Sequence, residues 1–190
     1  MLKATRQDKQ QVTDILTRSF ATNNSVNYIV QQDHKKMRRI RALMDYSFEL
    51  CFLFGEVFIS EDRKAAALIL YPEKKRTTLK TLLLDLKLLV QSVGIRNAKK
   101  VLDREAKIDQ IKPKTTMTYI WFIGVDPDHH HAGIGSKLLE SIIAHSTRPI
   151  YLETSMVKNL PWYERYGFQI YGELDLGYKM YFLKKEPDQA

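Results

Sequence analysis

Residues 124–145, GVDPDHHHAGIGSKLLESIIAH, hold the residue types in this chain that are best suited to chemistry. Three consecutive histidines precede Gly133 and Gly135, between an apolar run and an amphipathic stretch. Histidines beside Asp126 and Asp128 suggest a metal site, whereas glycines before a helix suggest an anion site. Consecutive side chains on a loop rarely converge on one ion with good geometry. The sequence therefore favours an anion site and predicts no metal.

The glycine pair stands where a phosphate-binding loop would stand. The run TMTYIWFIGV (116–125) predicts a buried central strand, and the spacing of Ile134, Leu138 and Ile142 predicts a helix after the glycines. The first amides of a helix lack internal partners and point outward at the positive end of its dipole. Glycines let a ligand approach the backbone closely. The loop therefore suits a pyrophosphate.

Two common pyrophosphate loops do not fit this sequence. A Walker loop requires Gly-x-x-x-x-Gly-Lys-Ser/Thr, and that spacing is absent. A dinucleotide-binding fingerprint requires a third glycine at the position that Leu138 occupies.

The loop instead resembles the acyl-CoA-binding motif of the GNAT acyltransferase superfamily, Gln/Arg-x-x-Gly-x-Gly/Ala. The matching stretch runs from His130 to Gly135, with His130 in place of Gln or Arg and His131 where a glycine is common. Backbone amides can carry a pyrophosphate regardless of these changes. The resemblance implies acetyl-CoA as acyl donor. It places contacts to this donor at His130, His131, Ala132, Gly133, Ile134, Gly135 and Ser136.

A second stretch, LETSMVKNLPWYERYGFQIYGE (152–173), resembles the later motif of the same superfamily. In that motif an Asn precedes a short helix that ends in Tyr-x-x-x-Gly-Phe, as Asn159 and Tyr163 do here. By this resemblance Tyr163 is the general acid that protonates the departing sulfur, with Tyr166 as second candidate and as a contact to the donor. Asn159 either binds the pantetheine amides or caps the helix, or does both.

The end of the central strand and the strand after it complete the implied site. The resemblance implies that the pantetheine arm pairs with the backbone of Ile123, Gly124 and Val125, where two strands splay apart, and that a backbone amide there polarises the thioester. On the central strand Tyr119 stands where some members of the superfamily have a basic carboxylate. Glu153 is the better carboxylate candidate, because alternation could aim it into the cleft. A purely structural role for Glu153 and deprotonation through water both remain open.

The pattern of elements predicts a mixed α/β chain of the order α-α-β-β-(α)-β-α-β-α-β. We expect a single GNAT-like domain over residues 1–190, with a helical insertion at about 77–111, broken near Gly94, before the central strand. The insertion is placed to cover the acceptor side. The expected helices are 7–21, 34–54, the region after Gly135 and 159–167, and the expected strands are 56–62, 65–71, 116–125, 149–155 and 179–185.

The charge and composition of the chain limit the classes of molecule that we expect it to bind. The net charge is +8, and residues 72–114 hold twelve basic and five acidic side chains. Their helical spacing favours a solvated helix face over a nucleic-acid site. The stretch 79–90 is too short and too charged to span a membrane, and the N-terminus lacks a signal peptide, so we expect a cytoplasmic protein.

The resemblance implies an N-acetyltransferase that moves an acetyl group from acetyl-CoA to a primary amine of a small molecule or peptide, by direct attack in a ternary complex. The alternative is a non-catalytic acyl-CoA-binding or sensing module. The acceptor's identity and the choice between monomer and homodimer are left open by the sequence.

Overall fold

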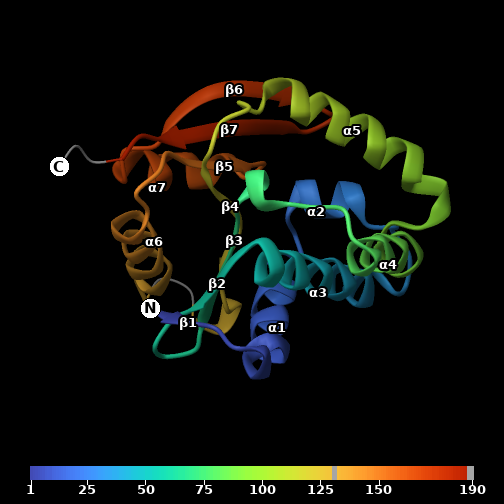
Figure 1. Ribbon diagram of the computed structural model, residues 1–190, viewed down its shortest axis with the longest axis horizontal. Coiled ribbons are helices and arrows are strands. Elements are labelled where there is room, and N and C mark those ends of the chain that lie inside the picture. Colours follow the sequence, from blue (N-terminus) through green and yellow to red (C-terminus); the bar gives the residue numbers. More distant parts are fainter. Residues whose placement is uncertain (130–131, 188–190) are drawn as a thin grey trace.

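A mixed sheet forms the centre of the molecule (Figure 1). The computed structural model describes residues 1–129 and 132–187, and within them seven strands follow the order β1-β2-β3-β4-β5-β7-β6. β4 and β5 are parallel, and all other neighbours are antiparallel. The strands are β1 Leu2–Lys3, β2 Gly55–Ile59, β3 Ala65–Leu70, β4 Thr118–Val125, β5 Ile150–Thr154, β6 Gln169–Asp175 and β7 Lys179–Lys185. The helices are α1 Lys9–Ser19, α2 Asn24–Ile29, α3 Lys36–Phe54, α4 Leu79–Leu88, α5 Ala98–Ile111, α6 Ile134–His145 and α7 Leu160–Arg165.

Helices cover both faces of the sheet. Strand β3 reads AAALIL and is buried along its whole length, as a central strand between two layers requires. Ala66 and Leu68 face the layer of α1, α2 and α3, whereas Ala67 and Ile69 face α6 and α7. The mixed α/β class expected from the sequence is confirmed, but the expected order lacked β1, α2 and β6.

A bulge in β4 changes which side chains face each layer. Leu68 of β3 pairs with Phe122 and Ile69 pairs with Ile120, so Trp121 is the extra residue. Trp121 and Phe122 therefore both lie on the α1–α3 side, with stacked rings 5.7 Å apart between centroids. Two large aromatic groups are in this way presented together on one face of the sheet.

The predicted helical insertion is present as α4 and α5, with the break at Gly94, whose φ is +75°. The inner side of α5 packs through Ile108 on Met180 and Phe182 of β7. The solvent-exposed surface of this region is not only charged, as expected, but also apolar. On α4 four leucines are 52–82% exposed, namely Leu79, Leu82, Leu83 and Leu86. Among the described residues, no helix combines the length and hydrophobicity needed to cross a membrane.

Glu49 of α3 is a nearly buried carboxylate, with its side chain 10% exposed. It pairs with Lys9 at 2.9 Å and with Arg6 at 3.2 Å. Burial alone would raise the pKa of Glu49, but these partners outweigh it and lower the pKa from 4.5 to about 2. The ionised carboxylate therefore contributes stability that is complete above about pH 4.5 and is lost as the pH falls towards 2.

We expect Glu49→Gln to lower the free energy of unfolding by about 2 kcal/mol at neutral pH, because the nearly buried carboxylate no longer pairs with Lys9 and Arg6. The loss of stability of the variant between pH 4.5 and 2 should be smaller than that of the wild type. Urea denaturation over a pH series measures both quantities. Glu173→Gln is the control, since Glu173 is 53% exposed and its nearest cation is 3.9 Å away. Equal effects of the two variants would contradict the prediction.

Candidate active site

Strand β4 has an open backbone edge at its C-terminal end. It pairs with β5 at Thr118, Tyr119 and Ile120 but not beyond, while its other edge stays paired with β3 as far as Val125. Among the described residues, the β5-facing backbone groups of residues 121–125 therefore have no strand partner. Unpaired groups of this kind can bind an extended ligand as an added strand. The segment includes Ile123, Gly124 and Val125, where the sequence placed the pantetheine arm.

The start of α6 lies directly after this edge. Gly133 has φ +71°, a left-handed conformation that favours glycine, and a Cβ there would meet only open space. Over the part of the chain that the structure describes, Lys137 is the first residue of α6 whose N–H finds a helical acceptor, at 3.1 Å from Gly133 O. The amides of Ile134, Gly135 and Ser136 thus have no backbone acceptor within residues 1–129 and 132–187, and they are suited to bind an anion.

Close packing fixes these amides in place. A Cβ at Gly135 would lie 3.0 Å from Val125 Cγ2, so α6 begins against the end of β4. The Ser136 hydroxyl accepts a hydrogen bond from Trp162 Nε1 at 3.0 Å, and its own proton remains available. A hollow of about 540 Å³ adjoins this point, and Lys64 and Lys137 line it together with the acids Glu61 and Asp62.

The histidine loop is described only in part. His130 and His131, two predicted donor contacts, lie outside the described residues. Asp126 and Asp128, the carboxylates considered for a metal site, both pair with Arg18 of α1, at 2.8 and 2.7 Å. They tie the loop to α1, and Ala132 lies exposed just before Gly133.

Tyr163 of α7 is buried on the α6 side of the sheet, 5% exposed, against Trp162 and Phe168. Its hydroxyl has no hydrogen-bonding partner among the described residues, and burial raises its pKa, so the phenol stays protonated at neutral pH. Tyr166, by contrast, donates its hydroxyl to Glu140 at 3.2 Å. Asn159 makes no side-chain cap to α7, so the capping role considered for it is wrong.

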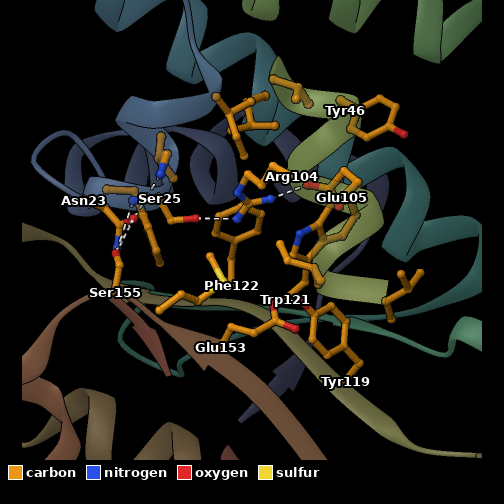
Figure 2. A pocket seen from close by; sticks show the side chains of 18 of the residues that line it. Asn23, Ser25, Tyr46, Arg104, Glu105, Tyr119, Trp121, Phe122, Glu153 and Ser155 are labelled. Carbon is orange, nitrogen blue, oxygen red and sulfur yellow. Dashed lines mark hydrogen bonds and ion pairs between the residues drawn. The ribbon is translucent and has the colours of Figure 1, made fainter. Parts of the chain in front are cut away.

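A cavity of about 550 Å³ lies on the other face of the sheet, between β4, β5 and helices α2, α3 and α5 (Figure 2). Its apolar wall includes Trp121 and Phe122 from the bulge, with Tyr46 of α3 opposite. Its polar wall includes Glu153, Thr154 and Ser155 at the end of β5. The helical insertion lines the cavity through α5.

Glu153 points into this cavity, as strand alternation suggested. Tyr119 donates its hydroxyl to Glu153 Oε2 at 2.5 Å, and Lys112 Nζ lies 3.0 Å from Glu153 Oε1. Tyr119 is fully buried, and this burial together with the neighbouring carboxylate raises its pKa. The structure thus joins the two groups that the sequence offered as alternatives near the base position.

Several polar groups of the cavity were missed by the sequence interpretation. Arg104 of α5 is the largest, with its side chain 7% exposed. The sequence did contain a signal for a buried arginine. Arg104 lies on the same face of the helix as Val101 and Ile108, where an apolar residue would be expected. Ser25 of α2 also lines the cavity, on a helix that the sequence interpretation did not include.

The arrangement above has known counterparts. Residues 93–170, which include α5, β4, α6, β5 and α7, match the sequence model of the acetyltransferase (GNAT) domain family. This part of the chain is similar to GNAT acetyltransferase domains. The resemblance drawn from the two motifs is therefore confirmed, and the first 92 residues, with α2 and α3 of the cavity wall, lie outside the matched range.

The individual relatives of this chain either align over a short segment or have low sequence identity. A segment of 67 residues is 37% identical to S-(2-succino)cysteine N-acetyltransferase of Bacillus subtilis (strain 168) and covers 31% of this chain but only 41% of that protein. A Corynebacterium glutamicum structure, described as histone acetyltransferase HPA2 and related acetyltransferase, aligns with TM-score 0.74 and 22% identity over 100% of this chain and 96% of its own. Arylalkylamine N-acetyltransferase 2 of Aedes aegypti aligns with TM-score 0.63 and 16% identity over 98% of both chains. At these identities the two structures establish the GNAT-like fold alone.

Proposed function

We propose that the protein is an N-acetyltransferase that moves an acetyl group from acetyl-CoA to a primary amine by direct attack within a ternary complex. One observation carries the proposal: the open backbone edge of β4 runs directly into the free amides at the start of α6. A thioester on a long arm that ends in a diphosphate needs both features, in this order. The amine-acetylating relatives support the acceptor class.

The residues present fit this donor. The amides of Ile134, Gly135 and Ser136 would bind the diphosphate, with Lys64 and Lys137 near its further phosphate. Residues 123–125 would pair with the pantetheine arm, and Asn159, whose side chain is not used as a cap, would bind its amides. We expect His130 and His131 to lie beside the diphosphate.

The groups that act on the amine and the group that protonates the sulfur would lie on opposite faces of the sheet. The amine nitrogen, held in the cavity, attacks the thioester carbonyl, so that an N–C bond forms and the C–S bond breaks. Backbone N–H groups at the open edge of β4 would stabilise the oxyanion. Tyr163 on the opposite face would give its hydroxyl proton to the departing sulfur and recover a proton from solvent. The products are an N-acetyl amine and free CoA.

Before attack the acceptor must lose a proton, because alkylammonium ions are not nucleophilic. Glu153 would take this proton directly or through a water molecule, and Lys112 and Tyr119 hold the carboxylate in the cavity. Holding both reactants in one geometry supplies a large share of the acceleration.

The test is to incubate the pure protein with acetyl-CoA and a panel of amines, and to follow free thiol together with the acetylated product by mass spectrometry. Stoichiometric appearance of both supports the proposal. Binding of acetyl-CoA by calorimetry without thiol release for any amine would favour the alternative, a non-catalytic acyl-CoA-binding module. Absence of binding would contradict both.

Glu153→Gln should lower kcat/KM for the amine about tenfold to hundredfold at neutral pH, because it removes the proton acceptor but keeps a hydrogen-bonding group. The deficit should shrink at pH 9, where more of the amine is already neutral. Thiol-release kinetics at the two pH values check this. Glu173→Gln, an exposed acid remote from the cavity, should match the wild type. A deficit that does not depend on pH would point to a structural role for Glu153.

A further inference from the structure

Arg104 is a charged side chain buried inside the cavity. Its neighbours on α5, Asp103, Glu105 and Lys107, are exposed, whereas the Arg104 side chain is 7% exposed and lies in the middle of the lining groups in Figure 2. Burying a guanidinium is costly unless it is paired and hydrogen-bonded. The packing of α5 alone therefore does not explain why a guanidinium is buried at this position.

The partners of Arg104 leave part of its hydrogen-bonding capacity unused. Nε donates to the Tyr178 hydroxyl at 3.2 Å, Nη2 donates to Ser25 Oγ at 2.6 Å, and Nη1 donates to Glu105. A guanidinium has five N–H groups, so two remain without a partner among the described residues. The Glu105 side chain is 50% exposed and thus shares its charge with solvent. Burial lowers the pKa of Arg104, but Glu105 and the other partners more than offset this, so it stays charged.

The cavity as a whole is charge-balanced. Lys75, Arg104 and Lys112 line it together with Glu105, Asp109 and Glu153. Lys112 already partly neutralises Glu153, at 3.0 Å. A simple ammonium ion entering this cavity would bring one positive charge beside two buried or half-buried cations. A ligand that brings its own carboxylate would not unbalance the cavity.

We propose that the amine acceptor also carries a carboxylate, which Arg104 binds through its two unused N–H groups while the amino group faces Glu153. The inference rests on the proposed acetyltransferase function and narrows its substrate class to amino acids or related zwitterions. Charge-assisted pairing of guanidinium with carboxylate is among the stronger polar contacts in proteins and is well suited to fix a small ligand.

The apolar wall of the cavity indicates which kind of side chain the amino-acid acceptor would carry. Trp121, Phe122 and Tyr46 line the cavity, and a volume of about 550 Å³ accommodates a small molecule but not a folded protein segment. An amino acid with a large apolar or aromatic side chain would fill this region. The acceptor predicted in this way is a hydrophobic amino acid.

Matched pairs of acceptors test the proposal: phenylalanine against phenethylamine, leucine against 3-methylbutylamine, and methionine against 3-(methylthio)propylamine. The members of each pair differ only in the carboxylate. With acetyl-CoA and wild-type protein, we expect kcat/KM for the carboxylated member to exceed that for its partner at least tenfold. Arg104→Gln should abolish this preference by lowering kcat/KM for the amino acid tenfold to hundredfold, while the simple amine changes less than threefold. Arg104→Lys should restore part of the preference, since it restores the charge.

Lys107→Gln is the matched control, because Lys107 lies exposed three residues further along the same helix and should leave every ratio unchanged. If wild-type protein acetylates simple amines as well as or better than their amino-acid partners, the inference is overturned, and this comparison does not depend on whether Arg104→Gln folds. An unchanged preference in folded Arg104→Gln also overturns it. If no amine of any kind is acetylated, it is instead the proposed function that fails.

Discussion

Tyr163→Phe is expected to lower kcat for acetyl transfer by about hundredfold or more, with little change in acetyl-CoA binding. The variant removes one oxygen from a ring that is packed against Trp162 and Phe168, so the apolar contacts of Tyr163 remain. Its hydroxyl has no partner among the described residues, so no protein hydrogen bond that the structure shows is lost. The burial that raises the pKa of Tyr163 keeps the proton on the phenol until the sulfur departs.

Tyr166→Phe is the matched control for this effect. It removes the same atom from the residue that follows α7, where the hydroxyl of Tyr166 donates to Glu140 instead of being unpartnered. We expect its kcat to stay within threefold of the wild type. Steady-state thiol release, with calorimetric titration of acetyl-CoA, separates the chemical step from binding. Equal losses of kcat in the two variants would remove Tyr163 from the role of general acid.

The folding pattern around the proposed donor site could be predicted because its signals are local. The β-formers of TMTYIWFIGV, the glycines after them and the apolar spacing of the next helix indicate β4, the loop and α6 directly, and the structure has them at Thr118–Val125 and Ile134–His145. Asn159 and Tyr163 were proposed in the same way, from a motif contained in one short segment. Each of these positions depends on neighbours within a few residues along the chain.

The cavity in which we propose that the acceptor binds could not be predicted in the same way, because it is assembled from distant segments. Ser25, Arg104 and Tyr178 meet through contacts that span 79 and 74 residues of sequence. The bulge that brings Trp121 and Phe122 to one face depends on the register between β3 and β4, which no local pattern specifies. Strand alternation alone would have placed these two rings on opposite faces.

Strand β6 is missing from the expected order of elements, although the sequence contains a signal for it. QIYGELD and KMYFLKK are two runs of β-forming character, and LGY between them contains Gly177, whose φ is +82° in the turn. That is a hairpin signal. It was overlooked because residues 169–173 were included in the stretch 152–173, which was interpreted only as the later superfamily motif. The exposed leucines of α4 were not anticipated either, since the solvated face expected for this region was a charged one, whereas α4 exposes Leu79 and Leu83.

Gly133→Val is expected to weaken acetyl-CoA binding at least tenfold, the second large effect that the structure predicts. Gly133 precedes the free amides of α6 in a left-handed conformation, φ +71°, which costs a β-branched residue about 1–2 kcal/mol. The loop can relieve this strain only by changing its backbone angles. Such a change re-aims the N–H groups of Ile134, Gly135 and Ser136, on which the binding of the diphosphate would depend.

Gly177→Val separates this effect from strain alone. Gly177 is also left-handed, φ +82°, and a Cβ there also meets only open space, but it lies in the turn between β6 and β7. Both variants should therefore lose a similar amount of stability, measured by thermal unfolding without ligand. Only Gly133→Val should lose binding in calorimetric titration and the upward shift of Tm that acetyl-CoA causes. If both variants bind the donor as the wild type does, the amides at the start of α6 do not hold its diphosphate, and the proposed function loses its main support.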